Sequence, residues 1–403
     1  MKQGWEIKKL GDICSFERGL TYAKGDEVET SSKGVLRSNN VDLSTNTLNF
    51  DEIKYLREDF EIPQKKKVQK GSLLMCISNG SKIHLGKVAL IEEDLDFAFG
   101  GFMGLLTPNE TVVYPKYFYY ALISPAYKFF INSLSDGANI NNLKFADLKS
   151  FDIPIPSLAE QERIVEILDR EFERIDALKA NAEQNLQHAK DLFQAALKQE
   201  LQPKEGWETK TLKQIGNTQT GTTPKTANKD YYGSYIPFIK PADVNIDGLG
   251  GLNYANEGLS KLGASAGRVF DANSILMVCI GATIGKVGYA DRQVSSNQQI
   301  NVLTPPHSFN SKYLYYYMTS SGFQQMVIRE GESAKATLPI INKSKWENLS
   351  ISYPWKDIQD KIVSHLDELN KHCKALEENY RKTIALCDDM KQALLRKAFN
   401  GEL

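Results

Sequence analysis

Several features that mark common classes of protein are missing from this sequence of 403 residues. No run of about 18 apolar residues occurs, so a transmembrane helix is not expected. The opening residues, Met1 to Glu6, lack the apolar core of a signal peptide. The five cysteines are odd in number and include no Cys-x-x-Cys pair, which argues against a disulfide framework and a zinc knuckle. We therefore expect a cytoplasmic chain without a metal site and without a membrane contact.

An excess of charge of one sign is also missing. Lys and Arg number 49 and Asp and Glu 50, which gives a net charge of −1 and excludes a histone-like protein. Locally the balance differs, because residues 202–356 hold 16 basic and 11 acidic side chains whereas residues 158–201 hold 6 and 10. This is a modest basic footprint for a polyanion. If DNA is the ligand, a partner is expected to supply part of the affinity.

Catalytic motifs are the third absence. The stretch from Gly281 to Val287 resembles a phosphate loop, but three residues instead of four separate its glycines and Val follows Lys286. We expect a hairpin there, with Lys286 at its edge. An Asn/Asp-Pro-Pro-aromatic string, which a base methyltransferase would need, does not occur. No histidine pair has metal spacing with a carboxylate partner. The sequence therefore predicts a chain that is not an enzyme by itself.

What the sequence does have is an internal repeat. The string Gly4–Leu10 recurs as 206–212, and 116–120 recurs as 312–316. Gln161 and Asp169 recur as Gln359 and Asp367. The order is kept and the offset drifts by only a few residues, so the chain is two copies of one unit of about 200 residues.

Each copy is expected to combine a mixed α/β domain with a long helix. Short apolar runs such as 72–77 and 274–280 predict strands, and 115–130 has helical spacing. No Pro or Gly occurs between about 159 and 200 or between 357 and 399, and prolines stand before both segments. We predict four parts: a globular domain at 1–157, a spacer helix at 158–201, a second globular domain at 202–356 and a C-terminal helix at 357–403.

The two long helices carry apolar residues at heptad spacing. In the second, ten positions from Ile362 to Leu394 step alternately by four and three residues. Two amphipathic helices in one chain are expected to bury their stripes against each other, as an antiparallel coiled coil of roughly 60 Å. The predicted fold class is α+β, with two similar domains, two antiparallel coiled-coil helices and a pseudo-two-fold. The predicted coiled-coil interface is Ile164, Leu168, Ile175, Leu178, Leu192, Ile362, Leu366, Leu369, Leu376, Tyr380, Met390 and Leu394.

Polar loops at matching places in both copies are candidates for DNA contact. Asn and Gln can bind adenine with two hydrogen bonds, Arg and Lys bind guanine, and Ser and Thr are adaptable. For any single residue, a turn-forming or solvated side chain is the competing interpretation. The candidates in the first copy are Lys24, Arg37, Asn39, Asn40, Asn79, Ser81, Lys82, Asn139 and Asn141. Those in the second copy are Thr222, Thr223, Lys225, Lys240, Asp243, Thr283, Lys286, Asn297, Gln298 and Lys335.

Three strings together resemble the specificity subunits of type I restriction–modification systems over nearly the whole chain. They are the Gly-Trp-Glu-x-Lys-x-Leu opening of each half, the series Gly221-Thr-Thr-Pro to Asn297-Gln298, and the long helix that closes with 399–403. The first copy departs from the series, since it has Gly19-Leu-Thr-Tyr in place of Gly-x-Thr-Pro and Phe99-Gly-Gly-Phe in place of Ser296-Asn-Gln-Gln.

The resemblance implies two target-recognition domains, each of which reads one half of a split double-stranded DNA site. It implies that the helices set the spacing and bind methyltransferase subunits, two in number, which in turn bind ATP-driven restriction subunits. No cofactor is expected on this chain. The assembled complex is expected to use S-adenosylmethionine, with ATP and Mg when the nuclease subunit is present.

Two alternatives belong to other classes. A coiled-coil scaffold with two protein-binding heads would explain the helices and the near-neutral charge, but not the paired polar loops. A methyltransferase or nuclease in its own right is disfavoured by the missing motifs.

Overall fold

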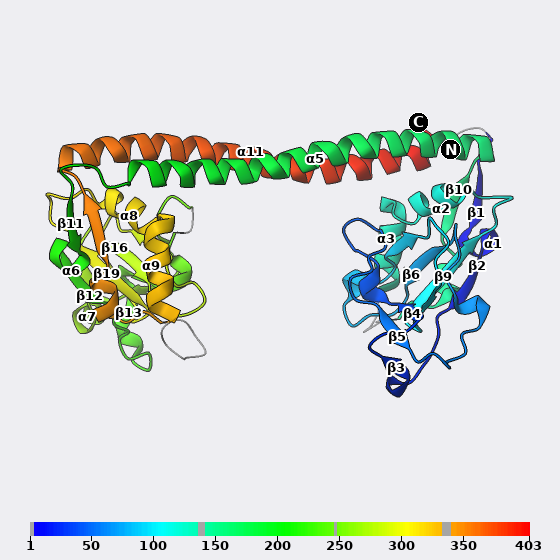
Figure 1. Cartoon of the computed structure of the whole chain (residues 1–403), viewed down its shortest axis with the longest axis horizontal. Coiled ribbons are helices and arrows are strands. Elements are labelled where there is room, and N and C mark those ends of the chain that lie inside the picture. The colour runs from blue at the N-terminus through cyan, green and yellow to red at the C-terminus, as the bar shows by residue number, and fades with distance from the viewer. Residues whose placement is uncertain (1–3, 136–141, 246–247, 333–339) are drawn as a thin grey trace. The chain divides into compact units, whose positions relative to one another are not determined.

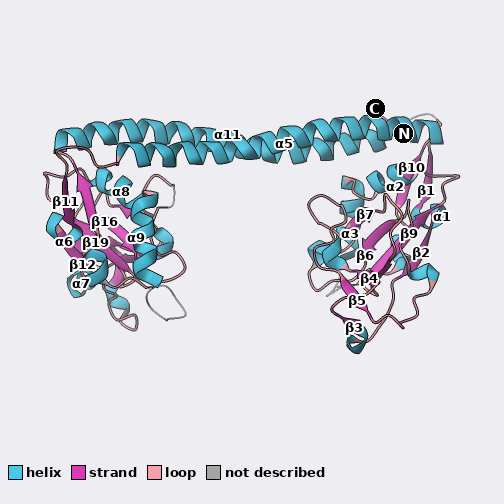
Figure 2. Ribbon diagram, viewed as in Figure 1, coloured by secondary structure: helices cyan, strands magenta, loops and turns pink. Residues whose placement is uncertain are grey.

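The computed structural model describes residues 4–135, 142–245, 248–332 and 340–403 (Figure 1). The chain divides into two compact units. The first unit is Met1–Ala182 together with Lys382–Leu403, and the second unit is Glu183–Arg381. Each unit contains one mixed domain of short strands and helices and a segment of each of two long helices (Figure 2). The long helices are α5 (Leu158–Glu200) and α11 (Lys356–Asn400).

The domain of the first unit has two four-stranded sheets and a two-stranded ribbon. One sheet is antiparallel, and its order is β2 (Cys14–Arg18), β9 (Met103–Pro108), β6 (Leu73–Cys76) and β7 (Val88–Leu90). The other has the order β3 (Glu27–Val28), β5 (Lys54–Leu56), β4 (Lys33–Leu36) and β8 (Phe97–Phe99), and β4 and β8 are parallel. The ribbon pairs β1 (Glu6–Lys9) with β10 (Asp152–Ile155) directly before the long helix. The helices are α1 (Leu10–Ile13), α2 (Pro115–Ala121), α3 (Pro125–Ser135) and α4 (Phe145–Leu148).

The domain of the second unit repeats the antiparallel sheet and the ribbon, and its mixed sheet keeps the parallel pair but has a different edge strand. Its antiparallel sheet is β12 (Asn217–Thr220), β19 (Ile300–Thr304), β16 (Ile275–Val278) and β17 (Val287–Tyr289). Its mixed sheet is β14 (Gly258–Leu259), β13 (Tyr232–Ile239), β18 (Val294–Ser296) and β15 (Val269–Phe270), and β13 and β18 are parallel. The ribbon is β11 (Glu208–Thr211) with β20 (Ser350–Tyr353). The helices are α6 (Leu212–Ile215), α7 (Lys261–Ala266), α8 (Ser311–Thr319), α9 (Ser321–Glu332) and α10 (Lys343–Glu347).

These elements bear out the predicted fold class of two similar mixed domains with long helices, and they correct one detail. The single helix expected over 115–130 is two helices, α2 and α3. Pro125 begins α3, because a proline has no N–H to donate within a helix and fits its first turn. The hairpin expected around Gly281 is present, since β16 pairs with β17 in antiparallel register.

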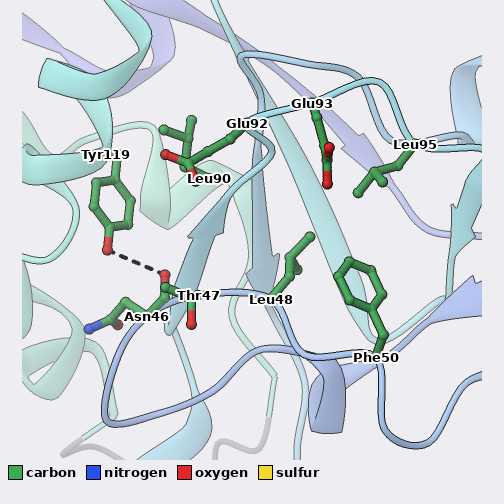
Figure 3. Close-up of a pocket in the computed structure, with 9 residues that line it drawn as sticks. All are labelled: Asn46, Thr47, Leu48, Phe50, Leu90, Glu92, Glu93, Leu95 and Tyr119. Carbon is green, nitrogen blue, oxygen red and sulfur yellow. Dashed lines mark hydrogen bonds between the residues drawn. The ribbon is translucent and has the colours of Figure 1, made fainter.

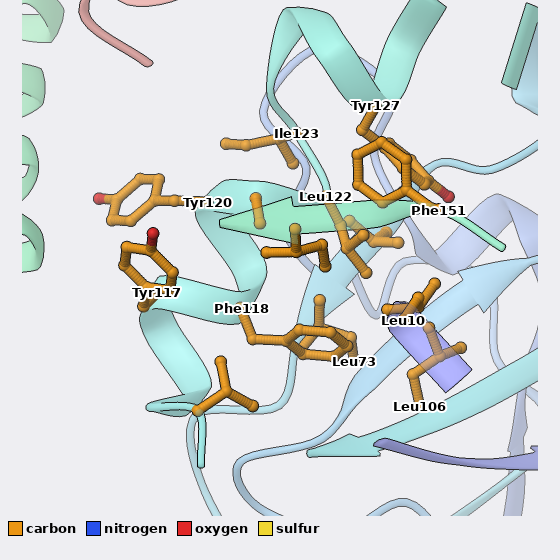
Figure 4. Packing of buried hydrophobic residues seen from close by; sticks show 14 of the residues in the cluster. Leu10, Leu73, Leu106, Tyr117, Phe118, Tyr120, Leu122, Ile123, Tyr127 and Phe151 are labelled. Carbon is orange, nitrogen blue, oxygen red and sulfur yellow. The ribbon is translucent and has the colours of Figure 1, made fainter. Parts of the chain in front are cut away.

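The core of the first unit lies between its antiparallel sheet and α2, α3 and the long helices. Leu10, Leu73, Leu106 and Phe118 are fully buried there, next to the aromatic rings of Tyr127 and Phe151 (Figure 4). Leu395 and Ala398, from the far end of the sequence, complete the same cluster. Burial of a side chain of this size contributes about 1.5–3 kcal/mol.

A tyrosine–aspartate contact ties each domain to the long helix that follows it. The Tyr120 hydroxyl donates to Asp169 at 2.5 Å, and Lys116 forms an ion pair with the same carboxylate at 2.8 Å. Tyr316 donates to Asp367 at 2.6 Å in the second unit, and Lys312 lies 2.8 Å from it. Burial and the neighbouring carboxylate raise the pKa of both phenols. The repeat in the sequence therefore reproduces this attachment side chain for side chain.

Within each unit the two long-helix segments run antiparallel. In the first unit Lys179 binds Asp388 at 2.8 Å, and Asp176 binds Lys391 at 2.5 Å. In the second unit Glu200 contacts His365 at 3.2 Å. As the residue numbers of the paired side chains increase along α5, those of their partners on α11 decrease, as in antiparallel helices.

Only part of the predicted apolar stripe is buried. Ile164, Leu168, Ile175, Ile362 and Leu366 are buried, and Leu369, Tyr380 and Leu394 are half-buried. Leu178, Leu192, Leu376 and Met390 are exposed by 41–52%, so the prediction of a buried interface is wrong for these four. Asn370 and Glu377 are buried instead. A straight helix of 3.6 residues per turn drifts by about 20° per heptad from a 3.5-residue stripe, which turns part of the stripe outward.

Candidate nucleic-acid interface

Each domain has a glycine, at matching places, where the backbone of another segment approaches too closely for a side chain. A Cβ on Gly19 would lie 2.0 Å from the carbonyl oxygen of Gly100. A Cβ on Gly221 would lie 2.1 Å from that of Asn297. The backbone bonds also match, because Gly19 N–H donates to Met103 and Gly221 N–H donates to Ile300, both at 2.9 Å. These contacts define corresponding positions in the two domains. The loops beside Gly221 are predicted polar loops, and in the first domain the predicted loop that begins at Arg37 lies next to Gly100.

In the first domain this region is an open cleft of about 670 Å³, which we call the recognition cleft. Arg37 and Asn39, both predicted contacts, line it with Arg18, Tyr22 and Phe102. The Nε of Arg37 is buried and has no hydrogen-bond partner among the described residues. A buried donor without a partner usually has a ligand or an ordered water as its acceptor. The cleft thus presents two guanidinium groups, an amide and two aromatic rings, with one carboxylate, that of Glu27.

The corresponding loops of the second domain carry hydroxyl and amide groups. The Thr223 hydroxyl donates to Gln298 Oε1 at 2.6 Å, which holds the exposed Gln298 side chain beside the Gly221 loop. The amide NH₂ of Gln298 donates to no acceptor within the described ranges. Thr222 Oγ1 is buried and lacks a partner there as well. Lys225, four residues after Gly221, is exposed.

Three predicted contacts have structural roles instead. Asn40 is fully buried and accepts from the N–H of Arg37 at 2.9 Å, and Asp243 is buried and accepts from the N–H of Lys240 at 2.9 Å. Asn297 is 8% exposed and accepts from the N–H of Gln299 at 3.1 Å. Their side chains close tight turns, so they hold the loops in shape and do not reach a ligand. The prediction of direct contact is wrong for these residues, and the turn-forming interpretation holds.

The other predicted contacts are spread more widely. The amide of Asn79 donates to Ser38 Oγ at 2.6 Å, which places it against the recognition cleft, and it accepts from the N–H of Ser81. Lys24, Ser81, Lys82 and Thr283 are exposed. Lys240 forms an ion pair with Glu257. Lys286 lines a different cleft, beside the long helices. Asn139, Asn141 and Lys335 lie outside the described residues.

Arg18, Tyr22 and Phe102 were missed by the sequence reasoning. Phe102 is 69% exposed, which is unusual for a phenylalanine. The signal was available, because Phe99-Gly-Gly-Phe in the first copy replaces Ser-Asn-Gln-Gln in the second. Exposed aromatic rings can stack on bases. The loop therefore has the same position in both domains but carries different side chains.

A second hollow in the first unit has the wrong charge for nucleic acid. It has a volume of about 200 Å³ and lies between Tyr119 and the segment 46–50 (Figure 3). The Tyr119 hydroxyl donates to the carbonyl oxygen of Asn46 at 3.3 Å, and Glu92 and Glu93 line the hollow. Two carboxylates repel phosphate groups, so this hollow is not part of the candidate interface.

Exposed leucine and methionine side chains form an apolar groove on the long helices of the first unit. Ile175, Leu178, Met390 and Leu394 line it, with Glu171, Arg174 and Lys397 at its edges. In the second unit the repeat puts Leu376 at the position of Leu178 and Leu192 at that of Met390, and both are exposed. The four residues that depart from the predicted stripe are therefore two equivalent pairs. Exposed apolar surface of this kind is typical of a protein-binding site.

Reactive groups of other classes are scarce. No group of His, Cys, Asp and Glu in the described part of the chain has the geometry of a metal site. All five cysteines are free thiols, and burial raises the pKa of Cys279 to about 12. Within the same ranges, no helix is long and apolar enough to cross a membrane.

The geometry agrees with comparisons to known proteins. The family model for the type I restriction modification DNA specificity domain matches residues 2–188 and, a second time, 204–386. The chain belongs to this family. It is 25% identical to the type I restriction enzyme StySPI specificity subunit of Salmonella potsdam. It is 24% identical to the EcoKI specificity subunit of Escherichia coli strain K12. Both alignments cover the whole of this chain and 90% of the relative.

Solved structures show the same fold. A chain from work on complex assembly and conformational transition of the type I R–M system superposes with a TM-score of 0.79 at 20% identity. The HsdS subunit from Thermoanaerobacter tengcongensis gives 0.59 at 19% identity. The alignments cover all of this chain and 99% and 98% of the other chains. The chain is therefore a type I specificity subunit with two specificity domains and long helices.

Proposed function

We propose that this specificity subunit binds double-stranded DNA at a split site, with the domain at 1–157 on one half and the domain at 202–356 on the other. The observation that carries the proposal is the pair of corresponding loops beside Gly19 and Gly221. Their backbones match, and their exposed side chains differ. Two domains that share a backbone but carry different contact side chains suit a site whose halves have different base sequences.

The partners follow from the same role. Methyltransferase subunits bind the long helices, 158–201 and 357–403, and restriction subunits join through them. The apolar groove at Leu178 and Met390, together with its counterpart at Leu376 and Leu192, is the docking surface, one for each of two methyltransferase subunits. The complex acts in the cytoplasm. It uses S-adenosylmethionine for methyl transfer, and ATP with Mg for restriction, on the partner chains.

The test is to express the chain with its methyltransferase partner and to map methylated adenines across a genome. The expected result is one two-part motif with a fixed spacer. A DNA affinity that does not depend on salt, or methylation without a common motif, would contradict the proposal.

The docking surface has its own test. Leu178→Asp and Leu376→Asp should each reduce the methyltransferase that co-purifies with the tagged chain. Leu158→Asp, at another exposed leucine of α5, is the matched control. Full recovery of the partner with both substitutions combined would show that it binds elsewhere.

A further inference from the structure

A polar cleft of about 510 Å³ lies in the second unit, between its domain and the long helices. We call it the helix cleft. Four cationic side chains line it: Lys190 from α5, Lys286 from the hairpin before β17, and Lys374 and Arg381 from α11. The carboxylate among its lining residues is Glu377. Cations therefore outnumber anions in the lining by three.

The one carboxylate is already neutralised. Glu377 is 5% exposed, and it accepts from Lys374 at 3.2 Å and from Arg381 at 2.8 Å. Lys190 and Lys286 form no ion pair with any of the described residues. Within the described ranges, the helix cleft thus holds two cations paired with a buried acid and two without a counter-ion. An anion in the cleft would supply the missing negative charge.

A buried amide also lines the helix cleft. Asn370 is 2% exposed and lies beside the Tyr316 hydroxyl, but neither its oxygen nor its nitrogen makes a hydrogen bond of good geometry in the described part of the chain. A buried amide that is not fully hydrogen-bonded commonly has an ordered water or a bound molecule as a further partner. Phe193 and Tyr315 add aromatic surface. The volume is in the range of small-ligand sites.

The first unit shows the same positions without this character. The repeat offset of 198 puts Phe172 at the position of Asn370, Asp176 at that of Lys374 and Asp388 at that of Lys190. Asp176 is paired with Lys391, whose ammonium lies 4.9 Å above the Phe172 ring, and Asp388 is paired with Lys179. The first unit therefore has ion-paired carboxylates where the second has Lys190 and Lys374, and it has a ring at the amide position. Its counterpart of Lys286 is Lys87, which is buried and donates to a backbone carbonyl. Among the described residues, the excess of cations around a cleft is a feature of the second unit.

We infer that the helix cleft binds a phosphate group, with Lys190, Lys286 and the amide of Asn370 as its contacts. Lys374 and Arg381 form ion pairs with Glu377 and add to the positive potential of the cleft. The phosphate has two possible sources: a small phosphate ester such as a nucleotide, or the backbone of bound DNA. In the second case the inference rests on the proposed function. The same side chains would bind the phosphate group from either source.

The experiment uses the full chain and three single substitutions. Lys190→Ala and Lys286→Ala each remove a cation of the helix cleft without breaking an ion pair among the described residues. Lys371→Ala is the matched control, because Lys371 is an exposed lysine of the same helix as Lys374 and does not line the cleft. Calorimetry with pyrophosphate and with ATP tests the small ligand. The salt dependence of affinity for a 40-base-pair duplex tests the backbone.

Loss of one charged contact should weaken pyrophosphate or ATP binding about tenfold in Lys190→Ala and in Lys286→Ala, with no change in Lys371→Ala. If DNA is the source, the small ligands do not bind. The slope of log affinity against log salt then falls by about one in each cleft variant only. The inference is overturned if the cleft variants and the control agree in both assays. Sequence-specific methylation that persists in that event would leave the proposed function standing.

Discussion

The two domains are most alike in their backbones and least alike at two groups of side chains. The strand order of the antiparallel sheet, the close approach at Gly19 and Gly221 and the tyrosine–aspartate attachment are all repeated. The loops differ, with Phe and Gly in the first domain where the second has Gln and Asn. The long-helix segments also differ. Their charged side chains form ion pairs in the first unit, and they line a cleft with an excess of cations in the second. Duplication thus preserved the residues that hold the domain together and left the exposed loop and cleft side chains free to differ.

The largest expected effect comes from the shared backbone feature. Gly19→Ala should destabilise the first domain by about 3 kcal/mol, because its Cβ overlaps a backbone oxygen that cannot move alone. Gly221→Ala should do the same to the second domain. Hydrogen exchange measured peptide by peptide should show faster exchange only in the domain that carries the substitution. Gly25→Ala and Gly322→Ala, whose Cβ atoms meet open space, are the controls. Equal exchange in all four variants would refute the close approach.

A second comparison uses one lysine position in two roles. Lys87 is buried and donates to the carbonyl oxygen of Val41 at 2.6 Å, and burial lowers the pKa of its ammonium group. Its counterpart, Lys286, lines the helix cleft. Lys87→Ala should lower the free energy of unfolding of the first domain by about 2 kcal/mol, since a buried carbonyl loses a charged donor. Lys286→Ala should leave the second domain as stable as before. Urea titrations followed by domain-specific exchange measure both, and equal losses would contradict the difference in role.

The third comparison concerns the exposed loops beside Gly19 and Gly221. Gln298→Ala should relax the choice of base at one position in one half of the methylated motif, at a cost of about 1–3 kcal/mol in discrimination. Phe102→Ala should affect only the other half. Sequencing of methylated sites measures both outcomes. Asn297→Gln is a useful contrast, because Asn297 holds a turn and its replacement should weaken binding to the whole half-site. A change in the same half-site from Gln298→Ala and Phe102→Ala would show that the two domains do not read separate halves.

The smallest effect is a dependence on acid that only the first domain should show. Hydrogen bonds from Ser44 and Thr45 lower the pKa of Asp42 to about 2, against about 3.9 in an unfolded chain. A lowered pKa stabilises the fold above pH 4, and the contribution is lost as the pH falls toward 2. The carboxylate is exposed, so we expect only about 0.5 kcal/mol. The second domain has the neutral Asn245 at this position.

Exchange protection of residues 42–47, corrected for the intrinsic effect of pH, should decrease between pH 4 and pH 2. Residues 248–250 should show no such change. Asp42→Asn should remove the difference between the domains. A decrease that persists in Asp42→Asn would assign the acid sensitivity to another group.

The sequence predicted the architecture well because a repeat and a heptad pattern are regular over long stretches. It predicted the site less well. Asn40, Asp243 and Asn297 have the residue types of a DNA contact, but the same side chains also satisfy turns, and composition cannot tell the two roles apart. Leu178 and Met390 kept the heptad spacing and still face outward, because small rotations along a helix decide which edge is covered. Burial and close approach are properties of three-dimensional packing, and the recognition cleft and the helix cleft depend on both.

The first unit is assembled from both ends of the chain. Leu395 and Ala398 belong to the core that otherwise comes from residues before 182, and residues 382–403 belong to that unit. About 200 residues separate the two parts, which at roughly 5–20 residues per second is about 10–40 s of translation. Through that interval the surface of the first domain that residues 382–403 cover stays exposed, while the second unit is synthesised without interruption. The domain that is synthesised first is therefore the one that finishes folding last.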